Sequence, residues 1–434
     1  MAAINGVHGN GITHEVGNKL DAPLMGKHPL YAMPPTMRAI PREELDVRSD
    51  EQIDKTILNA PPVSSEKNVW FFWDKGYSHV HQYAKRNIRA WHRRLSPFGW
   101  TIRVVDLTDG PSGISKFLDT TDPKLFPACY HEGRVDGPHR GQTVSDLVRC
   151  PLLLTYGGIY SDVTTMILGD LEKLCNSTIF DPASRYEFIV FNGGNEEAPR
   201  CPFNFFMAAR PGNPYIQRVQ DLLMILWASE GGRTNIGGMD KHPLIKDPPR
   251  WQVVEEMLKG DSDGRSFAEW RDDLWDYGVH MTVMNQVLGT VDKDLGWNGP
   301  EYGEKHIFAL DIATHALLID YLAFFSGARA FQLLSLPLPR EGTGQTEDQK
   351  AARNIVEQLL ATSFAVKLGH SGTRIFGETL GLLWRKNAGS DDVVGTYAHW
   401  LRFAMVHWTR IENPKPLEFK AQKPLKVGPL LRVE

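Results

Sequence analysis

One short stretch of the chain holds the residues whose types and spacing best suit group-transfer chemistry. Asp146 and Arg149 stand three residues apart, a spacing that places a carboxylate and a guanidinium on one face of a helix. Gly157 and Gly158 follow, and they permit a sharp reversal of the chain and a close approach of backbone to a ligand. Asp162 then emerges at the carboxyl end of a short apolar strand. Together these residues predict a ligand site.

The position of Asp162 indicates the kind of chemistry. Ligands of open α/β sheets bind at the carboxyl ends of the strands. A carboxylate there can hold Mg²⁺ or Mn²⁺, with the remaining ligands supplied by water and substrate phosphates. Such an ion would neutralise a pyrophosphate leaving group. The same residues also suit structural roles, with Asp146 capping a helix, Arg149 in solvent and Asp162 capping a turn. Their spacing alone does not choose between these interpretations.

A strand–helix–strand unit precedes this segment and must position it. Residues 68–73 form an apolar, aromatic run that stops at the turn residues 74–76. Residues 78–95 carry apolar side chains at helical spacing, and residues 100–106 again have the composition of a strand. A unit of this kind predicts two parallel strands joined by a helix.

Helices and strands continue to alternate beyond the segment, and the last third of the chain is mostly helical. The predicted helices are 144–156, 214–228, 312–334, 347–365 and 377–386, and the predicted strands are 159–163, 186–191 and 201–210. We therefore predict an α/β fold with a mixed, mainly parallel sheet flanked by helices and a helical C-terminal part. Its parts are an N-terminal extension (1–65), a main domain (66–310), a helical region completing the site (311–413) and an extended tail (414–434).

Composition excludes several classes of protein. The chain has 434 residues, of which 42% are hydrophobic and 23% charged, as in a globular protein. Its net charge of -4 offers no strongly basic field for nucleic acid. The four cysteines are sparse and lack the spacing of metal ligands. They predict neither a structural zinc site nor a disulfide framework, and they favour a reducing compartment.

The chain also lacks recognisable targeting and membrane segments. The N-terminus has neither an apolar core nor a charged start, so it predicts no signal peptide. No apolar run reaches the length of about 18 residues that suggests a membrane span. The nearest candidate, 315–339, is interrupted by Asp320 and Arg329. These features predict a soluble, cytoplasmic protein.

The segment 156–164, Tyr-Gly-Gly-Ile-Tyr-Ser-Asp-Val-Thr, resembles the sugar-binding region of glycosyltransferases that contain a DxD motif. In those enzymes a Ser/Ala-Asp-x-x-Arg helix leads to Gly-Gly-x-Tyr-x-Asp-x-Asp. The match is closer to the capsular-polysaccharide-synthesis type, whose usual form is Gly-Gly-Ile/Val-Trp/Tyr-x-Asp-x-Thr. Segments 68–76, 204–214 and 395–400 resemble further parts of that family in the expected order, so the resemblance covers about residues 68–405.

The resemblance implies a fold and a set of site residues. The fold would be GT-A-like, with a Rossmann-like nucleotide-sugar transferase domain over residues 66–310. The catalytic residues would include Asp146 and Asp162. The residues contacting the donor would be Trp73, Asp74, Lys75, Arg149, Gly157, Gly158, Tyr160, Thr164 and Lys367. For Asp74 and Lys75 an ordinary turn is the alternative.

One departure bears on the metal. Thr164 stands where a strict DxD motif has its second carboxylate, and threonine is a poor direct metal ligand. In such folds a late His or Asp often completes the metal and pyrophosphate shell. His370 is the candidate here, with Lys367 pairing with phosphate charge. We therefore predict Mn²⁺ or Mg²⁺ held by Asp162 and His370; an ordinary surface histidine is the alternative.

Two other acidic segments could contribute to catalysis or metal binding. The loop 233–243 could contact an acceptor, with Asp240 or His242 as general base, although a structural loop explains the same residues. The run Asp272-Asp273-Leu-Trp-Asp276 is better explained as the solvated face of a helix than as a metal cluster.

The leading interpretation is a metal-dependent glycosyltransferase that moves a sugar from a nucleotide diphosphate sugar to a hydroxyl acceptor, either a small molecule or a glycan. The alternative comes from fungal enzymes that resemble the same family but are tRNA-dependent, arginine-containing cyclodipeptide synthases using arginyl-tRNA in secondary metabolism. The acidic DDxxE motif of that group is missing, and the nearest run is 272–276. A third interpretation, suggested by Thr164, is a scaffold that has lost its chemistry.

Overall fold

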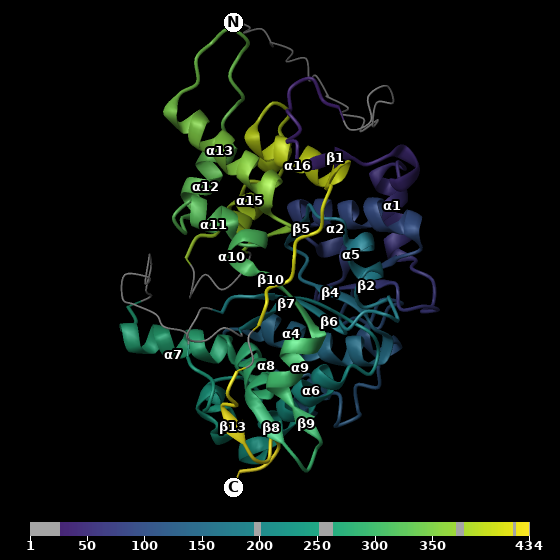
Figure 1. The fold of residues 1–434 in the computed structure, drawn as a ribbon, viewed down its shortest axis with the longest axis vertical. Helices are drawn as coiled ribbons and strands as arrows, with labels where there is room; N and C mark the ends of the chain where they lie inside the picture. The colour runs from purple at the N-terminus through teal and green to yellow at the C-terminus, as the bar shows by residue number, and fades with distance from the viewer. Residues whose placement is uncertain (1–26, 195–200, 251–263, 370–376, 420–421, 434) are drawn as a thin grey trace, which may run out of the picture.

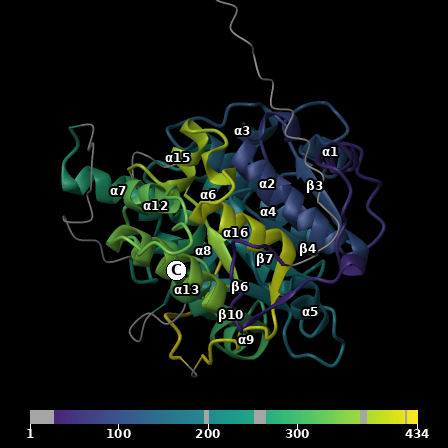
Figure 2. The ribbon, with the colours of Figure 1, turned by 90° about the horizontal axis from the view of Figure 1, so that it is seen from above.

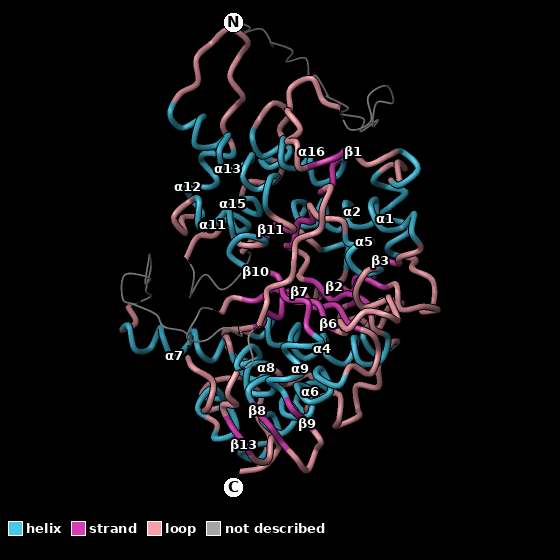
Figure 3. The backbone as a smooth tube through the Cα atoms, in the orientation of Figure 1, coloured by secondary structure: helices cyan, strands magenta, loops and turns pink. Residues whose placement is uncertain are grey.

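A six-stranded sheet lies at the centre of the computed structural model, which describes residues 27–194, 201–250, 264–369, 377–419 and 422–433. The strand order is β10-β6-β7-β4-β2-β3, and Figure 3 shows these strands in magenta between two groups of helices. The strands are β2 (Asn68–Phe72), β3 (Thr101–Val105), β4 (Gly158–Ser161), β6 (Phe188–Asn192), β7 (Pro202–Ala209) and β10 (Ile307–Asp311).

Five of the six strands run in the same direction. β2 is parallel to both β3 and β4, and β6 is parallel to β10. β7 lies between the two groups and is antiparallel to β4 and to β6. All five residues of β2 and of β6 are buried, as expected where helices cover both faces of a sheet. The predicted mixed, mainly parallel sheet flanked by helices is confirmed.

Helices cover the sheet in two layers (Figure 1). The upper layer and the lower layer each pack a separate hydrophobic cluster against one face of the sheet. Figure 2 shows α2 and α16 lying across the strands. The upper layer includes α1 (Asp50–Leu58), α2 (Gln82–Leu95), α5 (Leu171–Asn176), α10 (Ile312–His315), α11 (Leu318–Leu322), α12 (Gly327–Leu334), α13 (Glu347–Thr362), α15 (Leu380–Lys386) and α16 (Tyr397–His407). The lower layer includes α4 (Arg140–Tyr156), α6 (Pro214–Ala228), α7 (Phe267–Tyr277), α8 (Val279–Gly289) and α9 (Gly299–His306). None of the helices in these described parts is long and apolar enough to cross a membrane.

The predicted helix 312–334 is wrong, because three short helices, α10, α11 and α12, occupy this segment. Phe324 and Phe325 break it with positive φ angles of 55° and 54°. Such a conformation costs about 1–2 kcal/mol per residue for a side chain with a Cβ atom. The next helix starts at Gly327, where a Cβ atom would stand 2.2 Å from the Glu378 carbonyl oxygen. Gly327 thus lets α12 pack closely against the segment that leads into α15.

A small second sheet ties the C-terminal region to the predicted site. β11 (Ala365–Lys367) pairs antiparallel with β5 (Thr165–Ile167), and Lys367 lies opposite Thr165. The predicted helix 347–365 accordingly ends early, at Thr362, and its last predicted residue belongs to β11. This pairing brings Lys367 next to the strand that follows Asp162.

The C-terminal tail crosses from one helical layer to the other. β12 (Trp408–Arg410) pairs with β1 (Met37–Ala39) in the upper layer. The tail then passes the edge of the central sheet, where the Leu417 N–H donates to the Ala309 carbonyl oxygen at 2.8 Å. In the lower layer β13 (Lys426–Val427) pairs with β8 (Thr290–Asp292), which also pairs with β9 (Trp297–Asn298). The yellow ribbon in Figure 1 follows this path.

Candidate active site

Asp162 lies at the carboxyl edge of the central sheet. It follows β4 directly, and its N–H donates to the Phe205 carbonyl oxygen of β7 at 2.8 Å. The parallel pairing of β2 with β4 puts Trp70 opposite Tyr160. The residues after β2 therefore leave the sheet at the same edge as Asp162. This is the edge at which open α/β sheets bind ligands.

Two cations flank the Asp162 carboxylate. The Lys367 Nζ atom lies 2.8 Å from Asp162 Oδ2 and 2.7 Å from the Thr164 hydroxyl oxygen. On the other side, an Arg149 Nη2 atom lies 3.8 Å from Asp162 Oδ1. The Asp162 side chain nevertheless keeps 29% of its surface exposed. A carboxylate, a hydroxyl and an ammonium thus meet at one partly exposed point.

Asp146 and Arg149 lie on one face of α4, as their three-residue spacing predicts. Arg149 Nη2 contacts Asp146 Oδ1 at 2.6 Å, while its Nη1 donates to the Asn204 carbonyl oxygen at 2.5 Å. The guanidinium lies over the Tyr160 ring, 4.8 Å from its centroid. Since α4 begins at Arg140, Asp146 lies inside the helix and does not cap it.

The electrostatics keep the Asp146–Arg149 pair ionised. Burial alone would raise the pKa of Asp146, but the charge of Arg149 and the hydrogen bond from the Asn204 amide outweigh it, so the pKa is lowered. Burial opposes the charge of Arg149, yet the neighbouring Asp146 holds the pKa of the guanidinium above its usual range. The pair is a fixed dipole beneath Asp162.

His280 of α8 belongs to the same cluster, and the sequence did not predict its place there. The Asn204 side-chain amide donates to Asp146 Oδ1 at 3.0 Å and contacts His280 Nδ1 at 3.1 Å. Burial lowers the pKa of His280, so its imidazole is neutral near neutral pH and Nδ1 accepts from Asn204. A single histidine in an otherwise apolar helix gives no signal of this contact, because only the packing of α8 against β7 brings it there.

Three residues predicted to contact the donor, Gly157, Gly158 and Tyr160, pack against other parts of the protein. A Cβ atom on Gly158 would stand 2.3 Å from the Asn68 carbonyl oxygen, and one on Gly157 would stand 2.6 Å from Pro211. Both glycines lie at the start of β4, the opposite end from Asp162. Tyr160 is fully buried. Neighbouring protein atoms thus lie close to all three residues, and their contact with the donor remains a prediction.

The residues after β2 remain candidates for the nucleotide. Trp73 is half-buried and meets the His81 ring edge to face, with centroids 5.4 Å apart. The Asp74 carboxylate accepts from the Lys75 N–H at 3.0 Å, and Lys75 is exposed. The structure thus contains the turn that the sequence offered as an alternative. Contacts of these residues with base or ribose remain a prediction.

Asp240 is placed in a different environment. Its side chain is 2% exposed, and its Oδ2 lies 3.6 Å from Arg250. Asp276 of α7 faces the same loop and accepts from the N–H groups of Gly238 and Asp240. Burial and the hydrogen bond with Asp240 raise the pKa of Asp276 to about 7. A buried carboxylate committed to this network is poorly suited to act as a base on a hydroxyl acceptor.

Comparison with known proteins identifies the family. The profile of the family described as capsular polysaccharide synthesis protein matches residues 36–236. The chain is 33% identical over 389 residues to the O-glycosyltransferase braB of Annulohypoxylon truncatum, covering 89% of this chain and 90% of that protein. The chain belongs to this glycosyltransferase family.

Two further fungal relatives agree with this assignment. The chain is 31% identical to the glycosyltransferase afumC of Aspergillus fumigatus, covering 89% of this chain and 95% of that protein. It is 28% identical to the O-glycosyltransferase PaGT of Phomopsis amygdali, covering 88% and 92%. The predicted family and the prediction of a transferase are confirmed. These relatives give no support to the tRNA-dependent alternative.

The metal site predicted for this glycosyltransferase is not assembled by the described residues. His370 lies outside them. Within them, no three His, Cys, Asp or Glu side chains are grouped so that they could hold a metal ion. Asp162 offers one carboxylate, and its Oδ2 is bonded to the Lys367 ammonium. The described residues around Asp162 therefore do not by themselves supply a donor set for a divalent cation, and binding of Mn²⁺ or Mg²⁺ remains a prediction.

Proposed function

We propose that the protein transfers a sugar from a nucleotide diphosphate sugar to a hydroxyl acceptor at the carboxyl edge of β2 and β4. The observation that carries this proposal is the meeting of Asp162, Thr164 and Lys367 at that edge, directly above the Asp146–Arg149 pair. A partly exposed ammonium held in place by two side chains suits a diphosphate, and carboxylates suit sugar hydroxyl groups. Membership of the glycosyltransferase family supports the same interpretation.

The chemistry requires a stabilised leaving group. The bond between the anomeric carbon and the diphosphate oxygen breaks, and its electron pair leaves with the diphosphate. The acceptor oxygen forms the new bond to the anomeric carbon and loses its proton to a base or to solvent. Negative charge therefore grows on the diphosphate oxygen. Positive groups fixed near that oxygen lower the barrier because they need no rearrangement during the reaction.

Three groups of residues would divide the work. Trp73, Asp74 and Lys75 would contact the nucleoside, because they leave the sheet beside Asp162. Lys367 would contact the diphosphate. Asp162 would orient the donor sugar, and the Asp146–Arg149 pair, whose side chains are 24% and 4% exposed, would hold Asp162 in place.

A two-step experiment tests the proposal. Thermal unfolding would be followed with UDP, GDP, ADP and CMP, and the products formed from the matching activated sugars would be identified by mass spectrometry. The proposal expects a nucleotide diphosphate to raise the Tm and a glycosylated product to form. Asp162→Asn should slow product formation by about a hundred- to a thousandfold, while Asp272→Asn, at an exposed pair with Lys241, should leave it unchanged. Failure of every nucleotide to bind and of every sugar to be transferred would contradict the proposal.

A further inference from the structure

We propose that the Lys367 ammonium takes the place of a divalent cation in this site, so that the donor diphosphate binds without a metal ion. This inference rests on the proposed function, because it concerns how the donor diphosphate is held. In this proposal, Lys367 performs the role of the metal ion that the family resemblance led us to expect.

The position of Lys367 is the first argument. Its Nζ atom lies between the side chains at the first and third positions of Asp162-Val163-Thr164, at 2.8 Å and 2.7 Å. Those are the two positions that carry carboxylates in a strict DxD motif. Pairing of Lys367 with Thr165 in the β11–β5 sheet fixes the backbone on both sides of this contact. The ammonium is therefore held by the fold where a metal ion would have to enter.

Charge is the second argument. Two carboxylates and one divalent cation sum to zero. In this site Asp162 contributes one negative charge, Thr164 none and Lys367 one positive charge, which also sum to zero. Replacing a carboxylate with a hydroxyl and adding an ammonium changes the local charge by as much as binding a divalent cation would. A divalent cation entering here would find one carboxylate and would be repelled by the ammonium.

Lysine also has the hydrogen-bonding capacity that a contact with phosphate requires. An ammonium carries three N–H groups. Two of those on Lys367 face Asp162 and Thr164, which leaves one for a phosphate oxygen. The side chain is 19% exposed, so it remains accessible to a ligand. Lysine binds phosphate as a point charge, and hydrogen bonds to charged groups are stronger than neutral ones.

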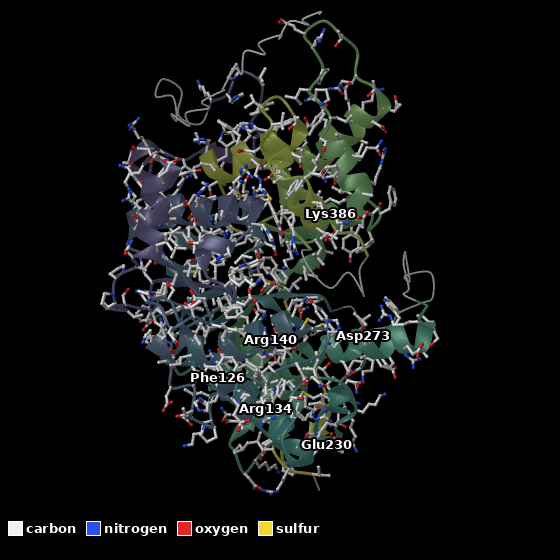
Figure 4. All side chains as sticks on the ribbon, turned by 180° about the vertical axis from the view of Figure 1, so that it is seen from behind. Phe126, Arg134, Arg140, Glu230, Asp273 and Lys386 are labelled. Atoms are coloured by element: carbon white, nitrogen blue, oxygen red, sulfur yellow. The ribbon has the colours of Figure 1, made fainter. Side chains whose placement is uncertain are left out.

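Equilibrium binding of UDP and GDP, measured by calorimetry on the full chain in EDTA and in Mn²⁺, tests the inference. The wild type should bind its nucleotide equally well in both. Lys367→Met should weaken binding in EDTA by about ten- to a hundredfold, the value of a lost charge-assisted hydrogen bond. Lys367→Arg should keep part of the affinity. Lys386→Met is the matched control. Lys386, which is labelled in Figure 4, is an exposed lysine at the end of α15 and forms an ion pair with Glu378.

A double variant makes the test specific to charge. Thr164→Asp combined with Lys367→Met restores the DxD pattern and removes the ammonium. This variant should bind nucleotide only with Mn²⁺, and the bound ion should appear in its electron paramagnetic resonance spectrum. Thermal unfolding of each variant shows whether it is folded. The wild type should bind no Mn²⁺ by the same spectrum.

Two negative results are distinguishable. Wild-type binding that is lost in EDTA and restored by Mn²⁺ would overturn the role of Lys367 and leave the glycosyl transfer intact. Wild-type protein that binds no nucleotide under either condition, and transfers no sugar, would overturn both the role of Lys367 and the proposed function.

Discussion

Two charged clusters in this molecule are built from the same kinds of side chain but are completed differently. In the upper layer, Arg402 contacts Asp391 at 2.7 Å, and the two side chains are 3% and 0% exposed. Arg86 also contacts Asp391 and bridges to Asp392. At the sheet edge, Asp162 and Lys367 are 29% and 19% exposed. The Asp391–Arg402 pair at the centre of the first cluster is closed by protein, whereas the Asp162–Lys367 pair keeps surface for a ligand.

The difference separates a structural ion pair from a site. Arg402 also bonds to Asn87 and to the Tyr83 carbonyl oxygen, which joins α16 to α2. Burial lowers the pKa of Arg402, and Asp391 opposes that effect. Ionised groups removed from water need pairing of this kind. An ionised group that keeps some exposure can exchange water for a ligand, so exposure together with fixed geometry identifies the candidate site.

The largest expected effect lies in the closed cluster. Asp391→Ala leaves Arg402 buried without its carboxylate and should lower the free energy of unfolding by about 3–5 kcal/mol. Urea denaturation would measure it. Nucleotide affinity per folded molecule should stay unchanged. A loss below about 1 kcal/mol, the usual upper value for an exposed pair, would remove the contrast between the clusters.

The open cluster should respond in the opposite way. Asp162→Asn keeps the shape of the side chain but removes its charge, and should lower kcat by about a hundred- to a thousandfold, the range found for one lost transition-state contact. The Tm should change little because the site is partly exposed. Steady-state kinetics and thermal unfolding on the same sample check both. A Tm loss as large as that of Asp391→Ala would make Asp162 a structural residue.

Local sequence patterns predicted the sheet well because its strands are buried on both faces. The runs 68–73 and 100–106 are mainly apolar, and both form strands paired in parallel. The helix 214–228 was predicted to the residue, since Pro214 starts it and Asn213 caps it. The break at Phe324 and Phe325 was not predictable, because phenylalanine does not favour a positive φ.

The site was predictable in part. The three-residue spacing of Asp146 and Arg149 fixed their shared helix face, and the strand end fixed the position of Asp162. Lys367 was a candidate through its phosphate-binding chemistry alone. Its contact with Asp162 depends on the β11–β5 pairing across two hundred residues, which no local pattern encodes. The sequence cannot show that neighbouring protein atoms lie this close to Gly157 and Gly158, whose contact with the donor remains a prediction.

Asp276 and Asp240 form a third charged cluster. It extends the comparison because its two side chains are largely buried and carry charges of the same sign. Burial and Asp240 raise the pKa of Asp276 from 3.8 to about 7. The folded protein therefore keeps a proton that the unfolded chain releases, and stability is lost as pH rises from about 4 to about 7. Asp276→Asn should remove on the order of 2 kcal/mol of that decline. Urea denaturation at pH 5 and pH 8 measures this change. An identical pH dependence in the variant would show that Asp276 does not hold the proton.

The smallest effect concerns how the open cluster is held. His280 accepts from the Asn204 amide, whose other N–H donates to Asp146. His280→Phe leaves that amide without one acceptor and should let it turn away from Asp146, lowering kcat by about tenfold, the value of roughly one hydrogen bond, while KM for the donor changes less. The pH profile separates this positioning role from a purely structural one. In the wild type, His280 gains a proton as pH falls through its lowered pKa, and the imidazolium can no longer accept from Asn204. Activity should therefore fall on the acidic side in the wild type and lose that step in His280→Phe, whereas a matching acidic limb in both proteins would assign the step to another group.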